Sequence, residues 1–259
     1  MTIQITTELI KELRDATGIS VMQCKRALEE AEGDMTKALA ILKKTSSDIA
    51  LKKMDRTAAD GAVMIKEAGN KSVLLALHCE TDFVSKNEDF TTLLSKLVDL
   101  ALEKGMDEMK AMSKDLIDPI IQKTGEKIEL GEGYVVEGPV LGNYVHNNKI
   151  GIIVSLEGGD KDLARDIAMH IAAMKPEYIT RDEINAEATK LITEIFEKEV
   201  ASIDKPEEIK KKMLEGKINT YFKEKTLLEQ AFIKNGDETI SQLLDKNKAK
   251  IKEVKRYSI

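Results

Sequence analysis

The residues from Ser72 to Phe90 read SVLLALHCETDFVSKNEDF, and this stretch decides how the chain is organised. Its first part, Ser72–Cys79, is short and apolar, which is typical of a strand that is covered on at least one face. The residues that follow change to a helical pattern, and a side-chain oxygen of Thr81 or Asp82 is suited to cap the new helix. We therefore predict a strand-to-helix corner with Phe83 at its turn.

A large apolar side chain at such a corner has two interpretations. It fills the core, as most phenylalanines do, or it projects from the surface toward another protein. Position alone favours the core for Phe83. The choice between the two depends on what the rest of the chain resembles.

Composition limits the class of protein. The chain has 259 residues, of which 33% are charged and 42% are hydrophobic, values that are typical of a soluble globular protein. The formal net charge of -6 argues against a dedicated nucleic-acid-binding protein, which is usually basic. The sequence has neither an apolar run long enough to span a membrane nor a secretory signal at its start, so we predict a cytoplasmic location.

The N-terminal residues carry the pattern of three short helices. Gly18 is suited to a left-handed cap at the end of the first helix. Ser20 and Gln23 form a capping-box pattern at the start of the second helix, and Asp34 is suited to cap the third. We expect a small three-helix module.

Two mixed segments follow and look alike. The first has two strands joined at Gly69-Asn70, a hairpin signal, and then helices at about 89–104 and 106–124. The second has three strands, at 127–137, 140–146 and 150–157, and then a helix at 161–174. This order indicates a weak internal duplication and two small α+β subdomains.

The residues from 181 to 225 form two long helical stretches with one break. The break is at Asp204-Lys205-Pro206, where Pro206 suits the first position of the second helix. The apolar face of the first stretch consists of Leu191, Ile195, Phe196 and Val200. This pattern predicts a helical hairpin, and an ordinary pair of surface helices is the alternative.

The predicted fold class is α+β, with an N-terminal three-helix module, a two-subdomain core with small antiparallel sheets, and a helical hairpin inserted into the second subdomain. The predicted parts are the module at 1–46, a polar linker with helical potential at 47–60, the first core subdomain at 61–138, the first part of the second at 139–180, the hairpin at 181–226 and the rest of the second subdomain at 227–259.

Residues for catalysis are hard to assemble. The sequence contains no GxGxxG, P-loop, GxSxG or HExxH motif. Cys24 and Cys79 lack metal-ligand or CxxC spacing, and we expect buried free thiols. His78 and His170 lie in apolar segments and are expected to be structural, whereas His146 ends a strand before a polar turn and is expected to reach solvent or a partner. We predict no catalytic residue, no cofactor and no metal.

Three stretches together resemble the elongation factor Ts family of bacteria. They are LIKELRDATGISVMQCKRALEEAEGDMTKALAIL at 9–42, Thr81-Asp82-Phe83-Val84 with the Ser85-Lys86-Asn87 that follows, and IAMHIAA at 167–173 before Lys175-Pro176. The resemblance covers about residues 4–257. It implies a ubiquitin-associated-like fold for the three-helix module and a coiled-coil protrusion for the hairpin.

The resemblance also implies a function. A member of this family is a guanine-nucleotide exchange factor in translation elongation, which binds elongation factor Tu with GDP, promotes GDP release by disturbing the Mg²⁺ and phosphate site, and stays on the nucleotide-free form until GTP binds. It has no catalytic chemistry of its own. The hairpin is a candidate for homodimerisation or a monomeric protrusion, and the sequence leaves both open. Many members continue with a further C-terminal module that also touches elongation factor Tu. We find no match to this module here and expect a smaller contact area with elongation factor Tu than in the longer members.

The same resemblance assigns roles to particular residues. The residues implied in dislocating Mg²⁺ from the partner are Thr81, Asp82, Phe83 and Val84, and those implied in partner binding are Phe83, His146, Arg14, Val21 and Met22. Phe83 and His146 would enter an apolar pocket of elongation factor Tu. Some members have methionine at the position of Val21, and the valine side chain is shorter than that of methionine.

Two other functions compete with this one. The first is an interaction module without exchange activity, built on the ubiquitin-associated-like fold and the coiled coil. The second is an unrecognised enzyme that uses Asp82, His146 or Cys79. The motif from Thr81 to Val84 disfavours the first alternative, and the lack of nucleophile–base or metal-ligand spacing disfavours the second.

Overall fold

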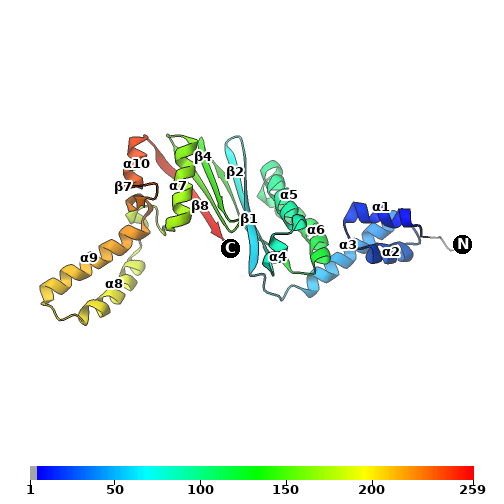
Figure 1. The fold of residues 1–259 in the computed structure, drawn as a ribbon, viewed down its shortest axis with the longest axis horizontal. Helices are drawn as coiled ribbons and strands as arrows, with labels where there is room; N and C mark the ends of the chain where they lie inside the picture. The colour runs from blue at the N-terminus through cyan, green and yellow to red at the C-terminus, as the bar shows by residue number, and fades with distance from the viewer. Residues whose placement is uncertain (1–4) are drawn as a thin grey trace. The chain divides into compact units, whose positions relative to one another are not determined.

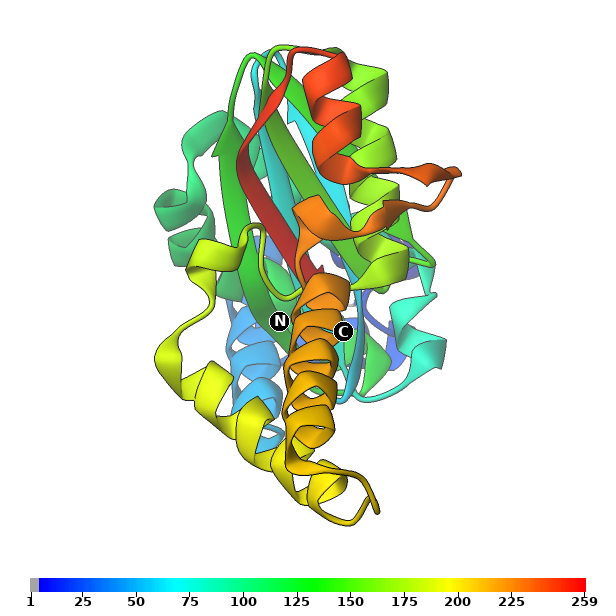
Figure 2. The same ribbon diagram turned by 90° about the vertical axis from the view of Figure 1, so that its left-hand side faces the viewer.

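The computed structural model describes residues 5–259 (Figures 1 and 2). It divides into two compact units. The first unit takes the residues up to Glu137 together with Val145–Gly151 and Lys255–Ile259. The second unit takes Gly138–Tyr144 and Ile152–Val254.

The first unit begins with the predicted three helices, α1 (Thr7–Thr17), α2 (Val21–Glu30) and α3 (Met35–Lys52). Their ends confirm the predicted caps at Gly18 and Asp34, whereas at Ser20 only half of the predicted capping box forms, because the Gln23 side chain accepts from the Ser20 hydroxyl. Gly18 is left-handed with φ 68°, Ser20 accepts the Gln23 N–H, and Asp34 accepts the Lys37 N–H. The buried side chains between the helices include Leu13, Cys24, Leu28, Ala38 and Leu42.

Helix α3 is longer than the sequence pattern indicates, because residues 47–52, which were predicted as the start of a linker, are its last turns. Contacts with α6 (Met106–Thr124) accompany this extension. The Ser47 hydroxyl donates to Asp118 Oδ2 over 2.7 Å, and Lys43 Nζ lies 2.7 Å from Asp115 Oδ2. Tertiary contacts of this kind add stability to a helix that would be only marginally stable from its local sequence.

A three-stranded sheet follows in the order β1-β2-β3, formed by β1 (Asp60–Ala68), β2 (Lys71–Cys79) and β3 (Ile128–Glu137). Neighbouring strands are antiparallel, and the central strand β2 is buried from Ser72 to Leu77. The expected order grouped the β3 residues with the second mixed segment, although the predicted first subdomain at 61–138 included them. The structure pairs them with β2, so their grouping with the second segment is wrong.

Helices α4 (Asp82–Ser85) and α5 (Glu88–Lys104) complete the first unit together with α6. Side chains from β2, α5 and α6 share one aliphatic core, in which Phe90 is the aromatic ring. Its other buried members include Val73, Leu75, Leu77, Leu94, Leu97, Val98, Met109, Ile117 and Ile121. Burial of these side chains supplies most of the driving force for folding this unit.

A second sheet has the order β4-β5-β8 and is formed by β4 (Val140–His146), β5 (Ile150–Glu157) and β8 (Lys250–Ser258). Most of its residues belong to the second unit, and those within Val145–Gly151 and Lys255–Ile259 belong to the first. Helix α7 (Lys161–Met174) packs against it (Figure 1). The approach is close, since a Cβ at Gly142 would lie 2.1 Å from the backbone carbon of Ala164. The remaining elements are β6 (Ala231–Phe232), β7 (Asn235–Thr239), α10 (Ile240–Lys246) and the short 3-10 helices η1 (Arg181–Glu183) and η2 (Leu227–Glu229).

The predicted hairpin is present as α8 (Ala186–Ala201) and α9 (Glu207–Lys225), which lie side by side in Figures 1 and 2. Pro206 precedes α9 as its N-cap, one position earlier than predicted. The predicted apolar face of α8 is divided, because Val200 is buried while Leu191 and Ile195 are exposed. None of the helices within residues 5–259 combines the length and the apolar character that crossing a membrane requires.

Candidate functional site

The corner between β2 and α4 presents one large apolar side chain to solvent. Phe83 is 84% exposed, whereas Val84 is 9% exposed and belongs to the core of the first unit. Consecutive residues on a helical turn are rotated by about 100°, so one side chain can face outward while the next packs inward. The preference for a core role that position alone gave to Phe83 is therefore wrong.

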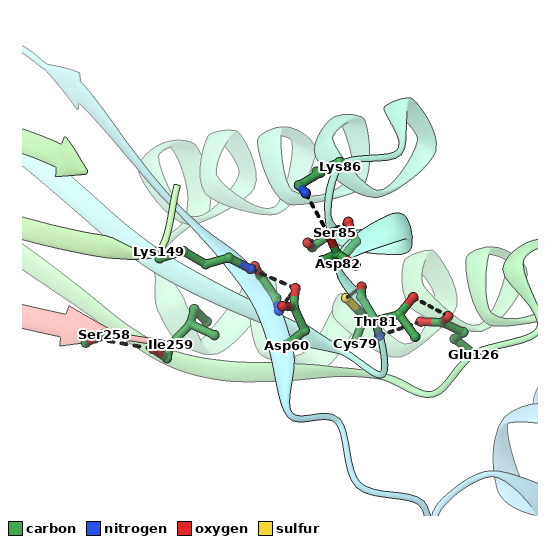
Figure 3. Close-up of polar contacts among 11 residues, drawn as sticks. Asp60, Cys79, Thr81, Asp82, Ser85, Lys86, Glu126, Lys149, Ser258 and Ile259 are labelled. Atoms are coloured by element: carbon green, nitrogen blue, oxygen red, sulfur yellow. Dashed lines mark hydrogen bonds and ion pairs between the residues drawn. The ribbon is translucent and has the colours of Figure 1, made fainter. Parts of the chain in front are cut away.

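Thr81 attaches this corner to the loop between α6 and β3 (Figure 3). Its backbone N–H donates to Glu126 Oε2 over 3.0 Å, and its hydroxyl donates to Glu126 Oε1 over 2.6 Å. Neither Thr81 nor Asp82 caps α4, which contradicts the capping expectation. The Thr81 side chain is oriented toward Glu126 instead, whose carboxylate gives its hydroxyl a charge-assisted acceptor.

Glu80 makes a second attachment to the same loop. Its Oε1 accepts the Lys127 N–H over 2.6 Å, and Arg56 Nη1 lies 3.2 Å away. These contacts hold the pKa of the Glu80 carboxyl below its ordinary value, and the hydrogen bond from the Lys127 N–H has the largest effect. The two residues that follow the end of β2 are thus fixed from one side, while Phe83 stays exposed.

Asp82 is exposed at the first position of α4. Its Oδ2 lies 2.7 Å from Lys86 Nζ (Figure 3), and this contact raises the pKa of Lys86. Surface ion pairs contribute little stability. The Asp82 carboxylate can therefore exchange Lys86 for another cation at small cost.

His146 ends β4 and is exposed, as predicted, on a tight turn. Asn147 and Asn148 continue the turn with φ values of 50° and 56°, a region that asparagine tolerates better than most residues. The turn closes where the Lys149 N–H donates to the His146 carbonyl over 2.9 Å. Both this turn and the Phe83 corner belong to the first unit.

The other three residues expected to bind a partner lie on the three-helix module. Arg14 is on α1, and Val21 and Met22 open α2; all three side chains are exposed. Leu39 on α3 is exposed as well. The module thus leaves several apolar side chains in solvent, which is a common feature of binding surfaces.

The two remaining histidines are held inside the chain. His78 Nε2 lies 2.8 Å from the Tyr257 hydroxyl. His170 is fully buried; its Nε2 lies 2.9 Å from Gln230 Oε1, and its Nδ1 accepts the Ile233 N–H over 3.3 Å. This pattern assigns a neutral ring with the proton on Nε2. These bonds give both rings a structural role.

The buried ring of His170 makes the stability of the chain depend on pH. Burial lowers its pKa from the ordinary 6.5, so the unfolded chain binds the proton more readily than the folded chain does. This contribution is complete above the unfolded pKa and is lost as pH falls through 6.5 toward the lower folded value. Urea unfolding of the intact chain and of His170→Gln from pH 8 to 5 should show the intact chain losing more stability on acidification. A constant difference between the two proteins would contradict this assignment.

The cysteines are free and buried, as predicted. Cys79 Sγ donates to the Thr81 carbonyl over 3.2 Å, and burial, followed by the charges of Asp60 and Glu126, raises the pKa of the thiol to about 12. A thiol with this pKa is not a nucleophile near neutral pH. Within residues 5–259, no three His, Cys, Asp or Glu side chains are grouped to hold a metal ion.

The fold and the site define an α+β protein that displays an aromatic corner and a strand-end histidine on one unit and a helical hairpin on the other. Comparison with known proteins identifies the family. A family model described as elongation factor TS matches residues 80–259, and a model of a UBA-like domain matches residues 4–42. The second match confirms the ubiquitin-associated-like fold predicted for the three-helix module.

Full-length relatives agree with these matches. The chain is 38% identical to elongation factor Ts of Hahella chejuensis over 262 aligned positions, which cover 98% of this chain and 92% of that protein. It is 39% identical to elongation factor Ts of Cellvibrio japonicus, with 98% and 90% covered, and 41% identical to that of Marinobacter nauticus, with 93% and 86% covered. The chain belongs to the elongation factor Ts family.

Proposed function

We propose that this chain is a guanine-nucleotide exchange factor in translation elongation. It binds elongation factor Tu with GDP, promotes GDP release, and stays on the nucleotide-free form until GTP binds. The observation that carries the proposal is Phe83, which is 84% exposed on a corner that Thr81 fixes to Glu126. The chain acts through binding, with no catalytic residue, cofactor or metal of its own.

Physical requirements support a mechanism without contact to GDP. A GTPase holds GDP through backbone amides and a Mg²⁺ ion on the phosphate oxygens. An exchange factor needs a higher affinity for the nucleotide-free form than for the GDP form. By linkage, the factor and GDP then weaken each other's binding by the same factor.

The corner supplies the groups that such a mechanism needs. Phe83 and His146 enter an apolar pocket of the partner and displace the element that supports its Mg²⁺ site. Asp82 brings a carboxylate toward that site, since its pair with Lys86 is exposed and easily exchanged. Thr81 and Val84 act from inside the chain: Thr81 is bonded to Glu126, and Val84 is packed in the core.

A second contact comes from the three-helix module. Arg14, Val21 and Met22 are exposed on α1 and α2 and dock on the GTPase domain of the partner. Two attachments on one chain raise the effective concentration of the second once the first has formed. The module thereby holds the Phe83 corner close to its target.

The proposed exchange activity is tested by stopped-flow release of a fluorescent GDP from elongation factor Tu. We expect an acceleration that grows with the concentration of this chain and then saturates; four decades would correspond to about 5.5 kcal/mol of barrier lowering. Binding to nucleotide-free elongation factor Tu is measured in parallel. Binding without acceleration would support an interaction module, and the absence of both would overturn the proposal.

Three further proposals concern partners and location. The net charge of -6 supports a chain that contacts no nucleic acid directly, and we expect it to act in the cytoplasm.

Leu191, Ile195 and Ile209 are exposed on α8 and α9, which keeps the hairpin a candidate for a homodimer contact. Analytical ultracentrifugation distinguishes a dimer from a monomer.

A further inference from the structure

An ion pair lies between the turn that carries His146 and the first strand of the sheet. Lys149 Nζ lies 2.7 Å from Asp60 Oδ1 and donates to the Gly61 carbonyl over 2.5 Å (Figure 3). Asp60 is the first residue of β1, and Lys149 follows His146 by three positions. The pair therefore joins segments that are far apart in the sequence.

The Asp60 carboxylate also faces the Phe83 corner. Although burial acts to raise the pKa of Asp60, hydrogen bonds from Lys149, from the Ser85 hydroxyl and from the Gly61 N–H hold it below its ordinary value. Ser85 belongs to α4, the same helical turn as Phe83. The strand that Asp60 opens thus packs against the helix of Phe83, and Asp60 itself is paired with the turn of His146.

The backbone around the pair is constrained at several points. The Val63 N–H of β1 donates to the Asn148 carbonyl over 2.8 Å, and the Ile259 N–H donates to the Lys149 carbonyl over 2.9 Å. Gly61 has a φ of 154°, and a Cβ there would lie 2.3 Å from the Leu77 carbonyl oxygen. The backbone at the start of β1 is therefore held in place, and the turn that follows His146 is hydrogen-bonded to it.

The side chains of Lys149 and Asp60 are 33% and 27% exposed, so the pair is partly shielded from solvent. Removal of one partner from such a pair leaves the other charge without compensation. Because the start of β1 is fixed, loss of the Lys149 ammonium releases the turn from Asp60 and from the Gly61 carbonyl. A change at Lys149 is therefore expected to shift the turn of His146 relative to α4.

We propose that Asp60 and Lys149 are positioning residues that set the separation between Phe83 and His146. The inference rests on the proposed exchange function, because it assumes that one pocket of the partner receives both side chains. Neither positioning residue needs to touch the partner. Displacement of one binding group by about 1 Å is enough to reduce a rate strongly, since both groups then no longer fit together.

The first test measures GDP release with the full chain. Lys149→Met keeps the length of the side chain and removes its charge, and we expect about a tenfold slower release. Lys149→Arg retains donors to Asp60 and Gly61 and should stay within about threefold of the intact chain. Lys96→Met removes the same charge from an exposed position of α5 and serves as the control.

The second arm is a double-mutant cycle with His146→Ala. If Lys149 acts by placing His146, the loss caused by Lys149→Met becomes small in the His146→Ala background. A loss of equal size in both backgrounds would overturn the positioning role, because Lys149 would then act independently of the ring. If the intact chain accelerates GDP release and Lys149→Met is equally fast, the positioning role is overturned while the exchange function stands.

The third arm does not depend on exchange activity. The sequence has three histidines, so the imidazole C–H signals in an NMR spectrum of the free chain can be assigned by His146→Ala, His78→Ala and His170→Gln. Lys149→Met should shift the His146 signal and leave the His170 signal in place, because His170 is fully buried in the second unit. An unchanged His146 signal would overturn the inference whatever the outcome with elongation factor Tu.

Discussion

The Phe83→Ala variant is expected to accelerate GDP release from elongation factor Tu about 30-fold less than the intact chain does. Aromatic side chains that fill a pocket at the centre of an interface commonly contribute 2 kcal/mol or more, and each 1.36 kcal/mol corresponds to a factor of ten in rate. Phe83 is 84% exposed, so almost all of its ring is available to be buried by a partner. The measurement is stopped-flow release of a fluorescent GDP.

The stability of this variant is the internal control. An exposed side chain outside caps and cores changes the free energy of unfolding by no more than about 0.5 kcal/mol, so the urea midpoint should stay in place. Phe83→Leu keeps an apolar side chain and should give an intermediate rate. A Phe83→Ala variant with undiminished activity would keep the exchange function but move its mechanism toward Asp82, His146 and the three-helix module.

Local patterns in the sequence were sufficient for the elements around this site. The caps at Gly18 and Asp34 and the buried strand β2 are encoded by neighbouring residues, and the structure places them as expected. The exposure of Phe83 is different, because an apolar residue after a strand has the same local pattern whether it faces in or out. Only the resemblance of the motif from Thr81 to Val84 favoured an exposed ring.

The contacts that hold the site could not be predicted in this way. Thr81 and its acceptor Glu126 are 45 positions apart, and Lys149 and Asp60 are 89 positions apart. Such pairs depend on how the strands and the loops between elements meet in space, and single-sequence periodicity carries no signal for that. The grouping of β3 with the wrong segment and the missing side-chain cap of α4 have the same cause.

The hairpin illustrates a related limit. Periodicity placed Leu191, Ile195 and Val200 on one apolar face, yet only Val200 is buried. An apolar stripe shows which residues share a helix face, and the neighbouring element determines how much of that face it covers. The uncovered part of the α8 stripe therefore became visible only with the structure.

The same substitution at Phe90, seven residues after Phe83, should have the opposite consequence. Phe90 is fully buried in the core that β2, α5 and α6 share. Removal of a buried phenylalanine side chain costs about 3–5 kcal/mol, through lost burial and the cavity that remains. Phe90→Ala should therefore unfold at a markedly lower urea concentration than the intact chain.

Exchange activity distinguishes the roles of the two rings. Under conditions where Phe90→Ala is folded, as circular dichroism shows, we expect GDP release within about threefold of the intact rate, since Phe90 has no exposed surface to offer a partner. The exposed ring then supports exchange and the buried ring supports stability, within one short stretch of sequence. A folded Phe90→Ala that loses as much activity as Phe83→Ala would show instead that core packing, and not the exposed ring alone, determines the rate.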